Sequence, residues 1–531
     1  MRNNIRVIGL CCAGCIVALF GTTRAGDWPQ WGGRPERNHV SDEKNLVDSV
    51  VPPVRKTNGE MDFSAAKNVR WVVYTGTASY GNPTVAGGRV FLGTDDQAIG
   101  DPRFERTKGG LVKCFDAATG KLLWQLVTPH RTGLPKHFHF SQQHLGTCSS
   151  VTVEGDRAYV VTSDAHVMCL DVHGQANGND GPFVDEGAYM AGPDKPPVEL
   201  KPTDADIIWK YDLITQAGVI PHDAASCSVL IHGDVLYTAT SNGVDQSHEK
   251  IPAPDAPAFI ALDKRTGRLI ARDSGLSARQ FHAQWSSPSL ATVNGRTLVF
   301  LGGGDGWCYA FEALKSVPES PVTLKKVWWY DCNPPEYRMR DGKPIVYTAG
   351  DKRKKTSPNK NDGTYVGPSE VIATPVFHNN RIYVAVGQDP AHGRGRGMMH
   401  CIDATKTGDI TASGKIWSYD GVERTIATAA VADGLVYITD LSGKMHCLDA
   451  DTGKPYWVHE FNSETWGGPL VADGKVYFGN HKEFVIMAHG KEPKILCTAR
   501  LGSFIDSTPV VADGVIYVAA QRTLWALGPT K

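Results

Sequence analysis

Ala429-Ala430-Val431-Ala432-Asp433-Gly434-Leu435-Val436-Tyr437 is the first of three nearly identical segments, and Pro469–Tyr477 and Pro509–Tyr517 are the others. Each consists of an apolar run, an Asp-Gly pair and a second run rich in β-branched and aromatic residues. Asp-Gly readily supplies the positive φ angles of a two-residue type I′ turn. Each segment therefore predicts a β-hairpin, and the hairpins recur every 40 residues.

Looser copies of the hairpin lie upstream. Their turns are centred on Gly87-Gly88, Gly155-Asp156, Gly233-Asp234, Asn294-Gly295 and Asn379-Asn380. Together with the three clear copies they make eight units, and a repeat of this length indicates a closed or stacked architecture.

A third and a fourth strand follow the hairpin in most units. The third ends in an Asp-x-x-Thr-Gly turn, as in Cys114–Lys121 and Cys447–Lys454. The fourth often carries a tryptophan: Trp124, Trp209, Trp328 or Trp329, Trp417 and Trp457. The third and seventh units have Ile270 and Leu496 instead.

Four antiparallel strands in about 40 residues, repeated eight times, predict a β-propeller. The eighth unit has only three strands before the chain ends, and Asn68–Tyr74, which contains Trp71, offers the missing one. We therefore predict an all-β, eight-bladed β-propeller over residues 68–531, with four-stranded antiparallel blades and the last blade closed by the N-terminal strand. Residues 26–67 are then an N-terminal extension.

Composition excludes several classes of protein. The 531 residues are 41% hydrophobic and 21% charged, with 56 Gly, which fits a soluble globular protein rich in turns. A formal net charge of -1 gives no field that attracts nucleic acid. The cysteines after Ala25 form no C-x-x-C pair, so a zinc ribbon and a c-type haem are unsupported. Those in the third strands occupy one repeat-equivalent position and are expected to be small packing residues.

Residues 1–25 predict an export signal. Arg2 and Arg6 precede the apolar run Val7–Phe20, and Thr23-Arg24-Ala25 is a small-x-small cleavage site. We expect a periplasmic or secreted protein. The alternative is lipidation at Cys15, but the apolar run continues past that residue. No other segment is long and apolar enough to span a membrane.

The segments Cys114–Trp124 and Cys447–Trp457 resemble the tryptophan-docking repeat of the PQQ-like, quinoprotein-type eight-bladed propellers. The opening Asp27–Gly33 is similar to that of exported bacterial members. The resemblance implies the propeller fold, and the family includes PQQ-dependent dehydrogenases, an outer-membrane assembly propeller and exported proteins of unassigned activity. A dehydrogenase of this kind would need PQQ, calcium and a catalytic Asp, and many also carry adjacent cysteines. The only adjacent pair, Cys11-Cys12, lies in the signal, and a pair between Cys148 and Cys227 is the alternative.

The long insertions predict which face is functional. Connections between second and third strands, and between successive blades, share one face of a propeller. Five of the largest insertions are of these two kinds: Asp95–Gly110, Asn242–Ala258, Gln388–Met399, Thr128–Leu145 and Cys332–Ser369. Val172–Asp206 and Glu312–Leu324 belong to the opposite face. Because binding residues concentrate on loops carried by a rigid scaffold, we expect the ligand on the first face.

Three histidines occupy equivalent positions on that face. His144, His222 and His282 each stand six residues before an aligned position at the start of three successive blades. Three neutral imidazoles with an open position suit zinc, copper or iron. Contact with a polar ligand and a purely structural role are the alternatives.

Other units place polar and aromatic residues near the same rim. The candidates are Tyr80, Trp285, Glu370, Arg424, Glu464, Trp466 and Asp506. A funnel of mixed charge with aromatic surfaces can bind a sugar, a peptide or a planar cofactor. The alternative is that strand starts simply require polar residues.

These observations favour an exported, monomeric binding or scaffolding module for a protein, sugar or small-molecule ligand at the cell envelope, rather than an enzyme. The first alternative is a PQQ-dependent alcohol or sugar oxidoreductase that uses calcium. The second is a metal-dependent enzyme built on the three histidines.

Overall fold

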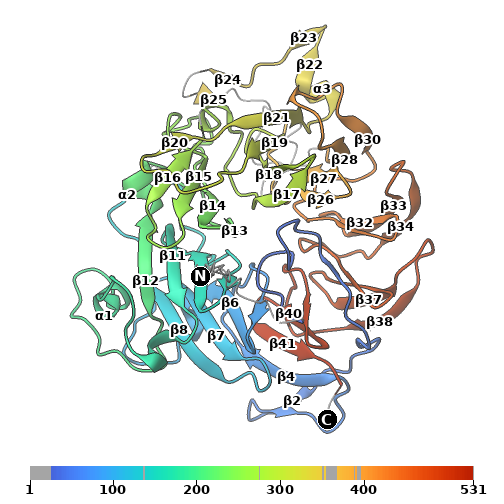
Figure 1. The fold of residues 1–531 in the computed structure, drawn as a ribbon. Coiled ribbons are helices and arrows are strands. Elements are labelled where there is room, and N and C mark those ends of the chain that lie inside the picture. Colours follow the sequence, from blue (N-terminus) through green and yellow to red (C-terminus); the bar gives the residue numbers. More distant parts are fainter. Residues whose placement is uncertain are drawn as a thin grey trace, which may run out of the picture.

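The computed structural model describes residues 26–135, 138–273, 275–349, 352–353, 368–387, 389–390 and 396–529. The predicted signal, residues 1–25, lies outside them. Eight four-stranded antiparallel sheets are arranged radially around a central axis (Figure 1), which confirms the predicted propeller.

The first four blades contain the following strands in order from the axis outward. They are β5 (Thr84–Ala86), β6 (Arg89–Asp95), β7 (Gly110–Asp116) and β8 (Leu122–Thr128); β9 (Thr152–Glu154), β10 (Arg157–Val161), β11 (His166–Asp171) and β12 (Ile207–Asp212); β13 (Leu230–His232), β14 (Val235–Ala239), β15 (Phe259–Asp263) and β16 (Leu269–Arg272); and β17 (Ser289–Val293), β18 (Arg296–Gly302), β19 (Trp307–Glu312) and β21 (Lys326–Asp331).

The other four blades follow the same plan. They contain β26 (Val376–His378), β27 (Arg381–Val386), β28 (Met398–Asp403) and β30 (Lys415–Tyr419); β31 (Ala430–Ala432), β32 (Leu435–Thr439), β33 (Lys444–Asp449) and β34 (Pro455–Glu460); β35 (Leu470–Ala472), β36 (Lys475–Gly479), β37 (Phe484–Ala488) and β38 (Ile495–Ala499); and β39 (Val510–Ala512), β40 (Val515–Ala519), β41 (Thr523–Leu527) and β4 (Val69–Tyr74).

The structure also contains short elements in addition to the four strands of each blade. Three helices lie in insertions: α1 (Glu186–Ala191), α2 (Leu213–Ala217) and α3 (Pro335–Arg338). The 3-10 turns are η1 (Asp96–Ala98), η2 (Gly174–Asn177) and η3 (Ser277–Arg279), and the additional two-residue strands are β1 (Val40–Ser41), β2 (Val54–Arg55), β3 (Met61–Asp62), β20 (Val322–Thr323), β22 (Met339–Arg340), β23 (Lys343–Pro344), β24 (Thr348–Ala349), β25 (Lys352–Arg353) and β29 (Gly408–Asp409). No helix in the described ranges is long and apolar enough to cross a membrane.

The ring closes as predicted. Strand β4, near the start of the chain, pairs antiparallel with β41, near its end, and Trp71 lies opposite Ala526. Figure 1 shows the two strands side by side, blue against red. Closure gives the last blade its fourth strand and leaves the sheet array without an open end.

Tryptophans of the outermost strands connect neighbouring blades. Each indole donates from Nε1 to a carbonyl in the turn of the next blade: Trp71 to Ala117, Trp124 to Val172, Trp209 to Lys264, Trp328 to Ala404, Trp417 to Ala450 and Trp457 to Gly490. The glycine of the Asp-x-x-Thr-Gly turn makes room for the ring. A Cβ on Gly453, whose φ is +70°, would lie 2.5 Å from the Trp417 indole. The recurring turn therefore forms the site against which the tryptophan of the preceding blade packs.

The third-strand cysteines are buried, free thiols that face these outer strands. Cys114 lies opposite Trp124, Cys401 opposite Trp417 and Cys447 opposite Trp457. The shared place of these cysteines supports the prediction that they are small packing residues. Cys308 is an exception to the predicted equivalence, because it lies opposite Tyr330 and Ala310 lies opposite the docking Trp328.

The seventh blade departs from the repeat. Leu496, expected to replace the docking tryptophan, is 38% exposed. The N-terminal extension packs there instead: the Val50 amide lies 3.4 Å from Cys497 Sγ, and Tyr477 donates its hydroxyl to the Val47 carbonyl. Leu46, Val47 and Val50 join the core shared by the seventh and eighth blades. The extension thus covers the junction that lacks a docked indole.

The start of the extension crosses the central axis on the face of the Asp-Gly turns. Its main chain bonds to the inner strands of the first, second, fourth, fifth and seventh blades, through Val85, Val153, Leu290, Phe377 and Val471. Figure 1 shows this segment in dark blue close to the centre of the ring. The sequence did not indicate this role for residues 26–41, which close one end of the central channel.

Arg37 anchors this crossing segment. Its guanidinium is fully buried and donates to the carbonyl oxygens of Pro288 at 2.9 Å, Val229 at 2.9 Å and Trp31 at 2.6 Å. One side chain therefore ties the segment to the third and fourth blades.

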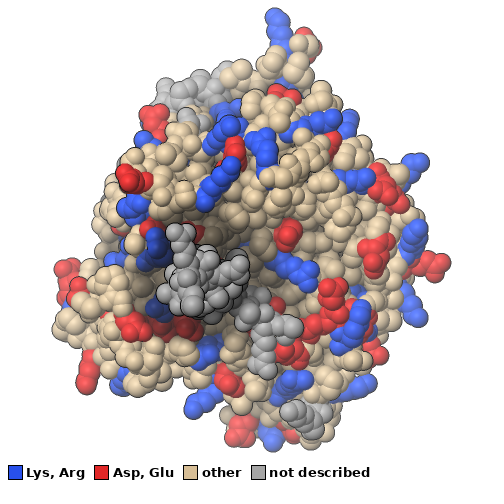
Figure 2. Space-filling view, viewed as in Figure 1, with Lys and Arg blue, Asp and Glu red and all other residues tan. Residues whose placement is uncertain are grey.

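Figure 2 shows the surface from the same direction, with Lys and Arg interspersed among Asp and Glu around the ring. This mixture agrees with the near-neutral net charge of the sequence.

Candidate functional site

A cavity of about 280 Å³ lies at the end of the channel opposite the Asp-Gly turns. Its walls include residues of the predicted functional loops, among them Gln143, Leu145 and Asp389. Trp31 of the crossing segment also lines it. The cavity is therefore bounded on one side by the insertion-bearing face and on another by the N-terminal extension.

Aromatic rings form much of the wall. Tyr80 and Trp466 are stacked, with ring centroids 5.8 Å apart and an interplanar angle of 19°. Trp466 donates its indole N–H to Glu464 at 2.8 Å, and Trp285 donates its own to the Ala224 carbonyl at 3.1 Å. These bonds hold the indoles of two predicted ligand contacts in place.

Three aspartates also line the cavity, and each lies beside a histidine. Asp223 is 3.0 Å from His139, Asp389 is 3.3 Å from His282, and Asp506 is 2.8 Å from His481. Asp506 additionally accepts from Gln521 at 2.5 Å. Among the described residues that line the cavity, none is Lys or Arg.

Two of the three predicted histidines meet beside this cavity. The rings of His222 and His282 have centroids 4.3 Å apart. A short main-chain ladder brings them together, because Pro221 bridges to Asn242 on one side while Gly243 bridges to Ala283 on the other. A Cβ on Gly243 would lie 2.7 Å from both the His222 Cβ and the His282 carbonyl oxygen. This close approach therefore requires glycine.

The third ring of the cluster is His248, not His144. His248 comes from the insertion 242–258, and its ring centroid lies 4.8 Å from that of His222 and 5.0 Å from that of His282. His144 instead has its ring 6.0 Å from that of His130. The loops entering the three blades follow different paths, so an equal offset in sequence does not place His144 equivalently.

The environment shifts the two buried imidazoles in opposite directions. Burial, reinforced by the neighbouring His282 and His248, lowers the pKa of His222 well below its usual value. Burial also opposes the charge on His282, but the carboxylates of Asp389 and Glu370 outweigh it and raise its pKa to about 10.

The remaining predicted residues lie around these groups. Glu370 is buried with Oε1 3.7 Å from His282 Nδ1. Arg424 donates to the main-chain oxygen of Asp389 at 3.0 Å. The predicted rim residues therefore lie in two groups, one around the histidine cluster and one around the Tyr80–Trp466 stack.

The cysteine pairing suggested by the sequence does not form. Cys148 and Cys227 are both free thiols. Burial raises the pKa of Cys148 to about 12, so this cavity residue is a neutral thiol at physiological pH.

The sequence family described as the outer membrane protein assembly factor BamB matches residues 104–316 and 406–492, more than half of the chain. The chain belongs to this family of PQQ-like repeat propellers.

The chain is also similar to quinoprotein dehydrogenases. It is 22% identical over 417 residues to quinohemoprotein alcohol dehydrogenase ADH IIB of Pseudomonas putida, covering 74% of this chain and only 51% of that relative. Among solved structures, quinohemoprotein alcohol dehydrogenase ADHIIG from Pseudomonas putida HK5 has a TM-score of 0.57 at 12% identity, covering 96% of this chain and 81% of the other. A europium-containing methanol dehydrogenase has a TM-score of 0.53 at 14% identity, covering 94% and 90%. At these identities the structural likeness establishes the fold.

The described lining of the cavity offers PQQ no cationic side chain. PQQ carries three carboxylates and would need cationic partners or a bound cation. The described lining residues supply three aspartates, which could hold such a cation, and Cys148 and Cys227 are free thiols.

Sequence reasoning missed three contributors to this region: Trp31, His248 and Asp389. His248 and Asp389 lie within insertions that were recognised, but the path of an insertion is not periodic. A histidine in a long loop of the predicted face was the one available signal for His248.

Proposed function

We propose that the protein is a binding propeller whose central cavity takes a small, ring-bearing polar ligand that is uncharged or cationic, namely a neutral or amino sugar. The stacked Tyr80–Trp466 pair carries this proposal. Aromatic faces pack against the apolar faces of ring ligands, while a few placed polar groups fix orientation. Asp506 beside the stack supplies an acceptor for hydroxyl or ammonium groups.

The size and charge of the cavity support the same class of ligand. About 280 Å³ is near the lower end of ligand pockets, which span roughly 300–1,000 Å³. Three aspartates without a described Lys or Arg in the lining disfavour anions. A binding role at the cell envelope, with a protein partner as a further possibility, stays a prediction, as does export through residues 1–25.

Replacement of Trp466 by Ala is expected to weaken sugar binding at least about 10-fold, because it removes one ring of the stack. The measurement is isothermal titration of the protein with neutral hexoses, disaccharides, amino sugars and PQQ plus calcium. Trp307→Ala is the matched control, since this half-buried indole lies under Arg279 and lines a different cavity.

Wild-type protein and Trp307→Ala should bind a neutral or amino sugar with equal affinity. Stoichiometric binding of PQQ with calcium, accompanied by dye-linked alcohol oxidation and no sugar binding, would overturn the proposal in favour of an oxidoreductase.

A further inference from the structure

The tautomer of His222 is determined by its main-chain partner. Its Nδ1 lies 2.7 Å from the Val244 carbonyl oxygen, which can only accept, so Nδ1 carries the hydrogen. Nε2 then holds the lone pair. The side chain is fully buried, and Nε2 has no hydrogen-bond partner among the described residues. A buried lone pair without a donor is costly unless a cation completes it.

His248 and His282 also have an oxygen near Nδ1. His248 Nδ1 is 3.2 Å from the Gln246 carbonyl oxygen, and His282 Nδ1 is 3.3 Å from Asp389 Oδ2. Their Nε2 atoms lie only 3.1 Å apart. The two nitrogens share a hydrogen bond at this distance, and a cation bound between the rings would replace its hydrogen.

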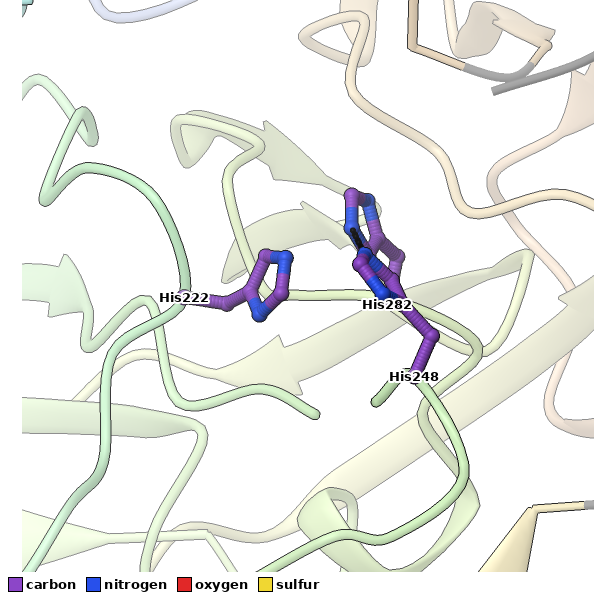
Figure 3. A group of neighbouring side chains, drawn as sticks. All are labelled: His222, His248 and His282. Carbon is purple, nitrogen blue, oxygen red and sulfur yellow. Dashed lines mark hydrogen bonds between the residues drawn. The ribbon is translucent and has the colours of Figure 1, made fainter. Parts of the chain in front are cut away.

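Figure 3 shows the three rings turned toward one another, with the His248–His282 contact dashed. One nitrogen of each ring lies within 4.8 Å of the corresponding nitrogen of the other two. Nitrogen ligands about 2.0–2.1 Å from a tetrahedral ion lie roughly 3.3 Å apart. Binding of one ion therefore requires the three nitrogens to move from separations of at most 4.8 Å to about 3.3 Å.

We propose that His222, His248 and His282 form a binding site for one divalent first-row transition-metal ion of the zinc type. Three imidazole nitrogens are a ligand set typical of zinc and copper. The oxygens behind each Nδ1 are the outer partners that orient metal-ligating histidines and increase their basicity. The metal site is distinct from the proposed sugar site, because its three ligands are not part of the Tyr80–Trp466 stack.

The carboxylates around the three histidines also favour a bound cation. Glu370 and Asp389 lie behind His282, and Asp223 has Oδ2 3.7 Å from His222 Nε2. These carboxylates offset the charge of a divalent ion bound by neutral ligands. Asp223 and Asp389 also line the cavity, so the proposed ion lies next to the ligand space.

The test is metal binding by the untagged full-length protein. We expect one equivalent of Zn²⁺ by elemental analysis, and visible d–d bands of tetrahedral Co²⁺ that Zn²⁺ displaces. His248→Ala, a half-buried insertion residue, should abolish the bands and lower affinity by roughly 100-fold or more. His222→Ala should do the same, and Asp389→Asn should weaken binding roughly 10- to 100-fold.

His144→Ala is the matched control and should retain one equivalent, because its ring lies against His130. The proposal is overturned if wild type binds no stoichiometric Co²⁺ or Zn²⁺, or if His248→Ala retains the ion. Detection of a proton shared between His248 and His282 in metal-treated protein, by nitrogen NMR of the imidazoles, would equally overturn it. Sugar titration in the presence of a chelator tests the cavity ligand separately.

Discussion

Arg37→Met is expected to lower the free energy of unfolding by about 2–5 kcal/mol. Methionine retains much of the side-chain volume but donates nothing, so the carbonyls of Pro288 and Trp31 lose the guanidinium. Each buried carbonyl left without a donor costs roughly 1–3 kcal/mol. The Val229 carbonyl is less affected because Thr152 also donates to it, at 2.8 Å.

The measurement is urea unfolding at equilibrium, combined with limited proteolysis of the N-terminal segment. Arg34→Met is the control, because Arg34 belongs to the same segment but its side chain is 69% exposed. It should change stability by no more than about 0.5 kcal/mol. Equal stability of the two variants would show that Arg37 does not anchor the crossing.

Loss of this anchor should also affect the cavity. Arg37 holds the Trp31 carbonyl, and Trp31 lines the ligand space. The contacts of Arg37 with the third and fourth blades therefore help to position Trp31 in the cavity wall. We expect Arg37→Met to weaken sugar binding, whereas Arg34→Met leaves it unchanged.

Trp328→Ala is expected to destabilise the protein by about 3–5 kcal/mol, the usual cost of removing a buried tryptophan. The Trp328 side chain is fully buried, packs against Phe300 and donates to Ala404 of the next blade at 3.2 Å. Its removal leaves a cavity at the junction of the fourth and fifth blades and an unpaired carbonyl.

The adjacent tryptophan provides the comparison. Trp329 points to the other face of β21, is half-buried, and lies under the ammonium group of Lys326. Trp329→Ala should cost less than about 1.5 kcal/mol, because the site is already open to water. Thermal and chemical unfolding of both variants measures the difference. Similar losses would contradict the assignment of Trp328 as the docking residue.

Most of the fold could be predicted from the sequence repeat. Asp-Gly hairpins, the Thr-Gly turn and the tryptophan spacing each report on interactions within one blade or between adjacent blades. Closure through Trp71 followed because the last unit lacked a strand and the first had one to spare. The seventh blade was less predictable, since the covering of its outer strand comes from Val47 and Val50, which belong to no repeat.

Part of the candidate site was predicted because its residues also follow the repeat. Tyr80, Trp285, Trp466 and Asp506 were found by their equivalent positions in the repeat, and all four line the cavity. His144 occupied an equivalent position too, yet the structure places His248 beside His222 instead. Equivalence in sequence predicts equivalence in space only while the connecting loops keep the same path.

The amino-acid sequence by itself determined the eight blades, their closure and the face that carries the long loops, because short-range spacing controls strand pairing and turn formation. Only the tertiary structure decided that His248 joins His222 and His282, and that Trp31 lines the cavity. Those placements depend on contacts between distant segments, such as the Gly243–Ala283 bridge and the bonds of Arg37 to two blades. No local pattern encodes such contacts.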